Sequence, residues 1–382
     1  MIARLWWPLA LVFVTAAGLE AQAPPPSKLD WNRIASLVVS QSLALGPGER
    51  VLLFWDQASD RGIAPALRTA VLAAGAVISA EIPAPTDADL AAIAKLSPDA
   101  QRLQRARRDS SWAAAFAAAD VAIWLPTPTA GLRDRPFEHL VERSKVRSIH
   151  FHWFLPPDGA DVDRVDSIYA AALAVPPATL RSAIMRIEEA VKGAEVVITA
   201  PNGTNLKLRV APDAWIHRND GDASRAKVGP ARTVRDREEE LPGSVFRTTD
   251  IAGAEGTIVG YATFDTRGPI VEATFAGNRV VRLEPARGAD ALISAWNSAT
   301  GDKAIPGELV IGTNPALPAV LPSGFMPYYG YGAGVVRLAF GDNWESGGRN
   351  RASNGETLLF IPDATVTANG RTVVRDGKLV DR

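Results

Sequence analysis

The apolar residues of the first half of the chain form short continuous runs separated by segments with helical spacing. The continuous runs are RVLLFWD (50–56), AVISAEI (76–82), DVAIWLP (120–126) and RSIHFHWF (147–154). Runs of this length and character are typical of strands that are buried on both faces, as in parallel sheets. Helices are expected before the first run, at about 31–45, and between the runs, at about 63–74, 110–120 and 136–143. Strands that alternate with helices predict a doubly wound α/β domain with right-handed crossovers.

The hydrophobic period changes after residue 193. Before it, Thr179 can cap a helix that ends at Gly193, with one apolar stripe formed by Leu180, Ile184, Ile187 and Val191. After it, apolar and polar residues alternate, which predicts strands with one buried face. These strands are EVVITA (195–200), NLKLRV (205–210), GTIVGYATF (256–264), PIVEATF (269–275) and RVVRLEP (279–285), with a hairpin turn at 276–279. We therefore expect an α/β domain over residues 24–192 and a β-rich domain over 193–382.

The first 23 residues have the features of a secretory signal peptide. Arg4 precedes an apolar run from Leu5 to Ala17, and Ala21-Gln22-Ala23 has the small-x-small pattern of a cleavage site. The alternative is a membrane anchor, but the run is shorter than the ~20 residues that a spanning helix needs. We expect cleavage near Pro24, export and no stable membrane span. The Ala-rich, Arg-over-Lys composition suggests a high-GC bacterium and so the periplasm.

Composition narrows the classes of partner and cofactor. With 41 basic and 42 acidic residues the formal net charge is −1, so no nucleic-acid partner is expected. The chain has no cysteine, which excludes disulfides and a thiol nucleophile. Neither a G-x-G-x-x-G after the first strand nor a G-x-x-x-x-G-K-[ST] is present, so no nucleotide cofactor is expected.

Three polar features invite a functional interpretation. His150 and His152 share a face of their strand and could form a metal pair, but packing at a strand end is the simpler interpretation. RDREEE (235–240) is interpreted as a solvated loop. The loop around Tyr328, with three tyrosines and several glycines, suits ligand contact, a subunit interface or packing on its own domain, and these alternatives stay open.

The segment from Pro306 to Ser353 carries a family resemblance. PGELVIGTNP (306–315) and RLAFG (337–341), together with LPGSVF (241–246) and EGTIVGY (255–261), resemble the catalytic domain of the thermophilic metallo-aminopeptidases, the aminopeptidase T and aminopeptidase S group. The resemblance implies a β-rich catalytic domain after an α/β domain, a homodimer with a substrate cleft between domains, and removal of N-terminal residues from peptides.

The family holds two metal ions with two glutamates, two histidines, an aspartate and a tyrosine, and the resemblance places most of these on other residue types here. Glu308 matches one glutamate, whereas Ser244 replaces the other. Arg337, which follows Glu308 by 29 residues as in the family, replaces a histidine, and Trp344 replaces the tyrosine. The final H-x-D falls near Gly355-Glu356-Thr357. Only Glu308 is matched as a metal ligand.

These substitutions change the chemistry that the site can perform. A guanidinium stays protonated and has no lone pair to donate to a metal. At about 4 Å and an effective dielectric constant of 20, it would be repelled by a divalent ion by roughly 8 kcal/mol. We therefore expect no metal cofactor and a non-catalytic or peptide-binding homologue, in which Glu308, Arg337 and Trp344 line one cavity and Arg337 pairs with Glu308 or Glu356. The cleft candidates are Arg337, Trp344, Ser244, Glu356 and Tyr328.

The alternative is an active metallo-aminopeptidase with a rebuilt site around Glu308. Asp342, Glu345 or Glu356 would then supply the missing carboxylates for zinc, cobalt or manganese.

Overall fold

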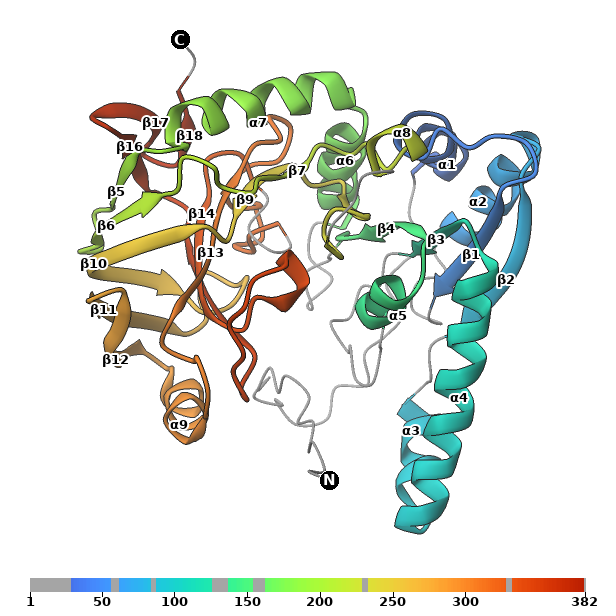
Figure 1. Cartoon of the computed structure of the whole chain (residues 1–382). Coiled ribbons are helices and arrows are strands. Elements are labelled where there is room, and N and C mark those ends of the chain that lie inside the picture. Colours follow the sequence, from blue (N-terminus) through green and yellow to red (C-terminus); the bar gives the residue numbers. More distant parts are fainter. Residues whose placement is uncertain are drawn as a thin grey trace. The chain divides into compact units, whose positions relative to one another are not determined.

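The computed structural model describes residues 29–55, 62–83, 87–125, 137–153, 162–228, 233–327 and 332–380 (Figure 1). Its contacts divide the chain into two compact units. Unit 2 comprises Ala23–Pro177 and Gly221–Pro242, and unit 1 includes Ala178–Asp220 and Gly243–Arg382. The division falls before the helix that the sequence analysis assigned to the first domain, and the chain returns to unit 2 for residues 221–242. Residues 1–23, interpreted as a signal peptide, lie outside the described residues, as does Tyr328.

Unit 2 contains a five-stranded sheet in which all paired strands are parallel. In spatial order its strands are β2 (Val77–Pro83), β1 (Arg50–Trp55), β3 (Val121–Trp124), β4 (Arg147–Phe151) and β8 (Glu238–Leu241). The continuous apolar runs of the sequence form the first four strands. Strands β1, β3 and β4 are buried along almost their whole length, as expected, whereas β2 at the edge of the sheet buries only Ile82. The expected α/β fold is confirmed for this unit.

The helices of unit 2 connect these strands. They are α1 (Trp31–Leu37), which continues as a short π-helix (Val38–Ser42), α2 (Ile63–Ala73), α3 (Asp87–Ala94), α4 (Pro98–Ala118), α5 (Phe137–Arg143), α6 (Val162–Leu173) and α8 (Arg225–Val228). Helix α4 begins earlier than expected. The Ser97 side chain caps it by accepting a hydrogen bond from Ala100 N, and Pro98 occupies its first turn. Its first half buries no side chain, so no apolar stripe marks it in the sequence.

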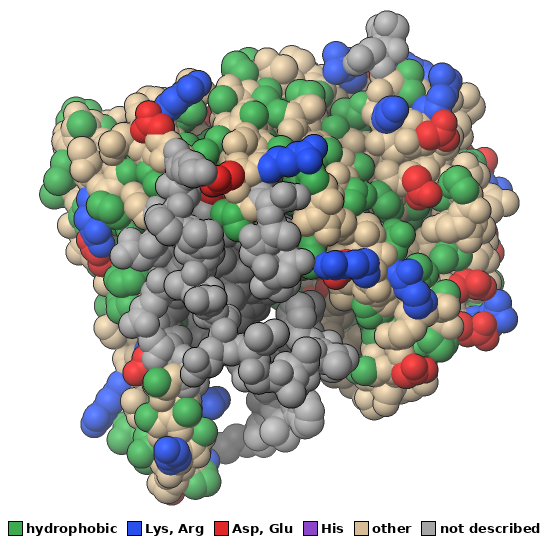
Figure 2. All heavy atoms as spheres, turned by 180° about the vertical axis from the view of Figure 1, so that it is seen from behind, with side chains coloured by type: hydrophobic (Ala, Val, Ile, Leu, Met, Phe, Trp, Pro, Cys, Tyr) green, Lys and Arg blue, Asp and Glu red, His purple; other side chains and the backbone are tan. Residues whose placement is uncertain are grey.

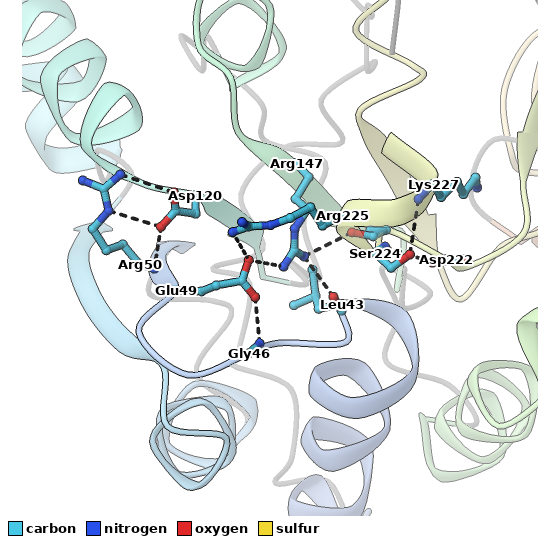
Figure 3. A network of polar contacts seen from close by, with 11 residues as sticks. Leu43, Gly46, Glu49, Arg50, Asp120, Arg147, Asp222, Ser224, Arg225 and Lys227 are labelled. Carbon is cyan, nitrogen blue, oxygen red and sulfur yellow. Dashed lines mark hydrogen bonds and ion pairs between the residues drawn. The ribbon is translucent and has the colours of Figure 1, made fainter. Parts of the chain in front are cut away.

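The segment 221–228 is attached to unit 2 by an ion-pair network in which Glu49 and Arg147 are buried and Arg225 is exposed (Figure 3). Glu49 Oε1 accepts hydrogen bonds from Arg147 Nη2 at 2.7 Å and from Arg225 Nη2 at 2.8 Å. Arg147 also donates to the carbonyl oxygens of Leu43 and Ala223. These contacts explain why the chain returns to unit 2 after Asp220.

The segment RDREEE was wrongly interpreted as a solvated loop, because its three glutamates form β8. Glu238, Glu239 and Glu240 are fully buried, and β8 pairs with β4 in parallel register. Arg235, Lys227 and His152 provide charged or titratable partners for these carboxylates. Buried carboxylates require such partners. Lys227 and His152 are too far from β8 in the sequence for a local sequence pattern to identify them as partners.

Unit 1 is built on a large antiparallel sheet. The strands along its main path are, in order, β18 (Lys378–Leu379), β17 (Arg371–Arg375), β16 (Thr365–Ala368), β5 (Glu195–Thr199), β6 (Asn205–Val210), β10 (Ile251–Tyr261), β15 (Glu356–Ile361), β14 (Val336–Gly341), β13 (Pro306–Gly312), β9 (Val245–Thr248) and β7 (His217–Asn219). Strands β11 (Ile270–Ala276) and β12 (Arg279–Arg287) extend from β10 as a hairpin. The turn between them contains Gly277 and Asn278, both with positive φ, as expected from the sequence.

One face of this sheet forms the apolar core of unit 1. Helices α7 (Pro177–Val191) and α9 (Asp290–Ser298) contribute to it, and alternate residues of β9, β13, β14 and β15 point into it, such as Phe246, Leu309 and Leu338. Because side chains alternate along a strand, the residues between them lie on the opposite face.

No single helix among the described residues is long and apolar enough to cross a membrane; the pair α6 and α7 reaches that length and composition, with a sharp bend between them. On the side of the molecule seen in Figure 2, Lys and Arg side chains are interspersed with Asp and Glu, in keeping with the net charge of −1.

Candidate functional site

Strand register brings two arginines and a glutamate together on the face of the large sheet opposite its apolar core. Val310 on β13 is paired with Arg247 on β9 and with Arg337 on β14, so the three side chains share a face. Glu308 lies two residues before Val310 and therefore projects from the same face. Arg247, Glu308 and Arg337 are called the Arg–Glu–Arg cluster below.

Glu308 is the centre of this cluster. Arg337 Nη2 donates a hydrogen bond to Glu308 Oε2 at 2.7 Å, and Arg247 Nε lies 3.7 Å from the same oxygen. Ser346 Oγ donates to the other oxygen, Oε1. Glu308, Arg337 and Arg247 are 4%, 2% and 1% exposed. Both carboxylate oxygens are thus already engaged by protein donors.

The loop after β14 positions Ser346 over Glu308. Asn343 anchors the loop, because its Nδ2 donates to Gly307 O at 3.0 Å and its Oδ1 accepts from Asn350 N at 3.0 Å. A short 3₁₀-helix, Trp344–Ser346, follows, and Asp342 Oδ1 accepts a hydrogen bond from Trp344 N at 3.0 Å. Of the residues expected to lie together, Arg337 contacts Glu308 directly. Trp344 is half-buried and belongs to the same short helix as Ser346.

Ser244 occupies a different place from the one that the family resemblance suggested. It precedes β9, and its Oγ shares a hydrogen bond of 2.6 Å with Thr313 Oγ1. Thr313 directly follows the end of β13 and is five residues beyond Glu308, which corresponds to about 16 Å of extended chain. On β9, the residue brought to Glu308 is Arg247, which the sequence analysis did not single out. Its only sequence signal is one charge inside an otherwise uncharged strand, Val245-Phe246-Arg247-Thr248.

Two further candidates are placed as follows. Glu356 begins β15, where it is paired with Gly341 and half-buried. Tyr328 lies outside the described residues. Across the described ranges, no three His, Asp or Glu side chains are grouped so that they could hold a metal ion.

Unit 2 has a second polar cluster, at the ends of β4 and β8. The His150 ring stacks on the Trp124 indole with centroids 3.9 Å apart, and His152 Nε2 lies 3.5 Å from Glu240 Oε1. This edge is formed by the carboxyl ends of parallel strands, where α/β sheets commonly bind ligands. The sequence analysis identified the two histidines but not their glutamate partner.

Comparison with known proteins supports the fold. No family model matches the sequence, and no curated protein matches it. The structure is similar to that of wild-type AmpT (aminopeptidase T) from Thermus thermophilus, with a TM-score of 0.64, 15% identity, and coverage of 92% of this chain and 99% of that chain. It is also similar to 2,5-dihydroxypyridine dioxygenase from Pseudomonas putida KT2440, with a TM-score of 0.59, 13% identity, and coverage of 92% and 97%.

These similarities define the class of the protein by its fold. The chain has a two-domain aminopeptidase-T-like fold, with a parallel sheet in one unit and a large antiparallel sheet in the other. The two neighbours carry the names of different activities, so the fold does not decide the chemistry. The function must be argued from the side chains of this chain.

Proposed function

We propose that this chain is an exported, non-hydrolytic protein with the aminopeptidase-T-like fold, which binds a peptide carboxylate at its Arg–Glu–Arg cluster. The observation that carries the proposal is the pairing of Glu308 with Arg337 at 2.7 Å, with Arg247 at 3.7 Å from the same oxygen. Glu308 is the one residue that the family resemblance matches to a metal ligand. Here it neutralises guanidinium groups instead.

The cluster does not fit a two-metal centre. A divalent ion bound by Glu308 would have to displace Arg337 and would then lie near two guanidinium groups. Neither guanidinium can donate a lone pair, and both repel a cation. Zinc, cobalt or manganese would therefore gain one carboxylate ligand at most and lose more through charge repulsion.

An anionic ligand fits the charge of the cluster better. Among its three charged residues, two are cationic and one is anionic. The planar fork of arginine matches a carboxylate in a bidentate geometry, so a peptide carboxylate could pair with Arg247 or Arg337. We further propose that the mature chain is a periplasmic homodimer, as the apolar leader and the family resemblance suggest.

Calorimetric titration of the purified mature protein tests this function. A short peptide with a free C-terminal carboxylate is compared with the same peptide as its C-terminal amide. We expect saturable binding of the first and at least tenfold weaker binding of the second. The variant Arg247→Lys keeps the charge but loses the fork, and it should weaken binding of the free carboxylate severalfold. Equal binding of both peptides, or of neither, would overturn the carboxylate site.

A further inference from the structure

Strand β8 places three consecutive glutamates inside unit 2. Glu238 and Glu240 lie on one face of the strand and Glu239 on the other, because side chains alternate. Glu239 accepts hydrogen bonds from Lys227 Nζ and, at 2.8 Å, from Gly221 N. Its charge is thus paired on its own face of the sheet. The other two carboxylates must be balanced separately.

Glu238 and Glu240 converge on one nitrogen of one arginine. Arg235 Nη1 donates to Glu238 Oε1 at 2.7 Å and to Glu240 Oε1 at 3.0 Å. His152 approaches the same Glu240 oxygen, with its Nε2 at 3.5 Å, and both of these side chains are 1% exposed. Two like charges on one buried face disfavour each other unless a second cation is near. A protonated His152 would supply that cation.

We propose that His152 is a proton-dependent switch that controls how firmly β8 is held in the parallel sheet. With a proton on Nε2, the imidazolium pairs with Glu240, so that His152 adds its positive charge to that of Arg235 beside the two carboxylates. After loss of the proton, the repulsion between the Glu238 and Glu240 carboxylates is offset less well, and the pairing of β8 with β4 becomes less stable. Histidine is the side chain suited to this role near neutral pH.

The surroundings of His152 in the described part of unit 2 determine which imidazole takes the proton. The His150 ring lies 4.2 Å from the His152 ring, and it is stacked on Trp124. Two adjacent imidazolium ions would repel, so one proton is expected for the pair. Asp166 on α6 accepts a hydrogen bond from Trp153 Nε1 at 2.8 Å, and Glu239 is paired with Lys227 on the opposite face of β8. The contact with Glu240 therefore favours the proton on His152.

The switch acts on a segment that leads into the proposed ligand site. Residues 242–244 connect β8 directly to β9, which carries Arg247. The chain therefore runs directly from the strand on which the switch acts to the strand that bears one cation of the Arg–Glu–Arg cluster. The proposal itself does not depend on what that cluster binds.

Proton NMR titration of the imidazole signals tests the switch, and the chain has only four histidines to assign. We expect His152 to titrate above the unperturbed value of about 6.5. Glu240→Gln, which keeps the shape of the side chain and removes its charge, should lower that midpoint. A midpoint below 6.5 in the wild-type protein would show that burial keeps His152 neutral, and would overturn the proposal.

Hydrogen exchange of the β8 amides gives a second readout. In the wild type, the protection factors of the Glu239 and Glu240 amides should fall as pH rises from 6 to 8. The fall should be roughly tenfold for each unit by which the pKa of His152 in the folded protein exceeds its pKa in the unfolded chain. His152→Gln should abolish this dependence. His139→Gln is the matched control, because His139 lies 3.6 Å from Glu142 at the surface of the same unit. Loss of the dependence in both variants, or in neither, would refute a specific role of His152.

Discussion

Arg337 and Glu308 lie on neighbouring strands with Nη2 and Oε2 2.7 Å apart, and both side chains are almost completely buried. A buried ion pair contributes little net stability compared with apolar residues of the same shape, but breaking it leaves an uncompensated charge. The pair therefore makes each residue sensitive to the loss of the other.

Replacing Arg337 alone should destabilise unit 1 strongly. We expect Arg337→Met to cost about 3 kcal/mol, at the lower end of the range for broken buried pairs, because Arg247 still lies 3.7 Å from Glu308. Urea unfolding, followed through the amides of the large sheet, measures the change. The double variant Arg337→Met/Glu308→Leu should recover only part of the loss, since it removes the carboxylate left behind by Arg337 but also takes that carboxylate away from Arg247.

Arg351→Met is the control for this experiment. Arg351 is largely exposed and lies 4.0 Å from Asp342, so its removal should cost less than ~1 kcal/mol. Equal effects of the Arg337 and Arg351 replacements would mean that the buried pair has no special role.

The sequence predicted those parts of the fold in which local pattern and burial agree. Strands β1, β3 and β4 follow from continuous apolar runs, and the β11–β12 turn follows from Gly277-Asn278. Strand β8 was missed because three glutamates in a row resemble a solvated loop. Partners such as Lys227 and His152, which permit their burial, are brought together only by the fold.

Only part of the candidate site was predicted from the sequence: the proximity of Glu308 and Arg337 was expected, whereas that of Arg247 was not. The family resemblance placed Arg337 near Glu308 and left Glu308 and Glu356 open as its partner, and the structure shows the pair with Glu308. The role of Arg247 depended on the register between β9 and β13, in which Arg247 rather than Ser244 comes near Glu308. Register is a property of strand pairing and cannot be obtained from either strand alone.

Glu49 should make unit 2 sensitive to acid. Burial raises the pKa of Glu49, but hydrogen bonds from Gly46 N, Arg147 and Arg225 outweigh this effect and hold the pKa below the ordinary value of 4.5. A depressed carboxylate pKa contributes stability that is fully present above about 4.5 and is lost as pH falls through the folded value. We expect Glu49→Gln to cost about 1.5–3 kcal/mol at pH 7 and progressively less below pH 4.5.

Thermal unfolding from pH 7 to pH 3 measures this dependence. Glu81→Gln serves as the comparison, because the hydrogen bond from Arg68 also holds the pKa of Glu81 below its ordinary value, but the pair is partly exposed. Its effect should be smaller at every pH. A difference between wild type and Glu49→Gln that grows on acidification would contradict the assignment.

Export predicts a processed N-terminus. Arg4, the apolar run from Leu5 and the Ala21-Gln22-Ala23 pattern lead us to expect a mature chain that begins at or near Pro24. Mass spectrometry of the protein from a periplasmic extract measures the terminus. The control is Ala23→Pro, which should block cleavage at this site and leave a longer, membrane-associated product. An intact Met1 on the wild-type protein would contradict export by this route.

The final prediction concerns metals and peptide hydrolysis. We expect the wild-type mature protein to show no turnover of a fluorogenic leucyl substrate with zinc, cobalt or manganese, and no rise in Tm with any of these metals. An ion that bound the native state would raise Tm by mass action. Arg337→His alone should also fail, because Arg247 would still lie 3.7 Å from Glu308 and too few donors would be present. Recovery of metal binding should require replacement of both arginines together with new carboxylate and histidine ligands. If the wild-type protein instead binds close to two equivalents of metal, and Glu308→Ala abolishes turnover, then a rebuilt aminopeptidase site exists and the non-hydrolytic proposal is wrong.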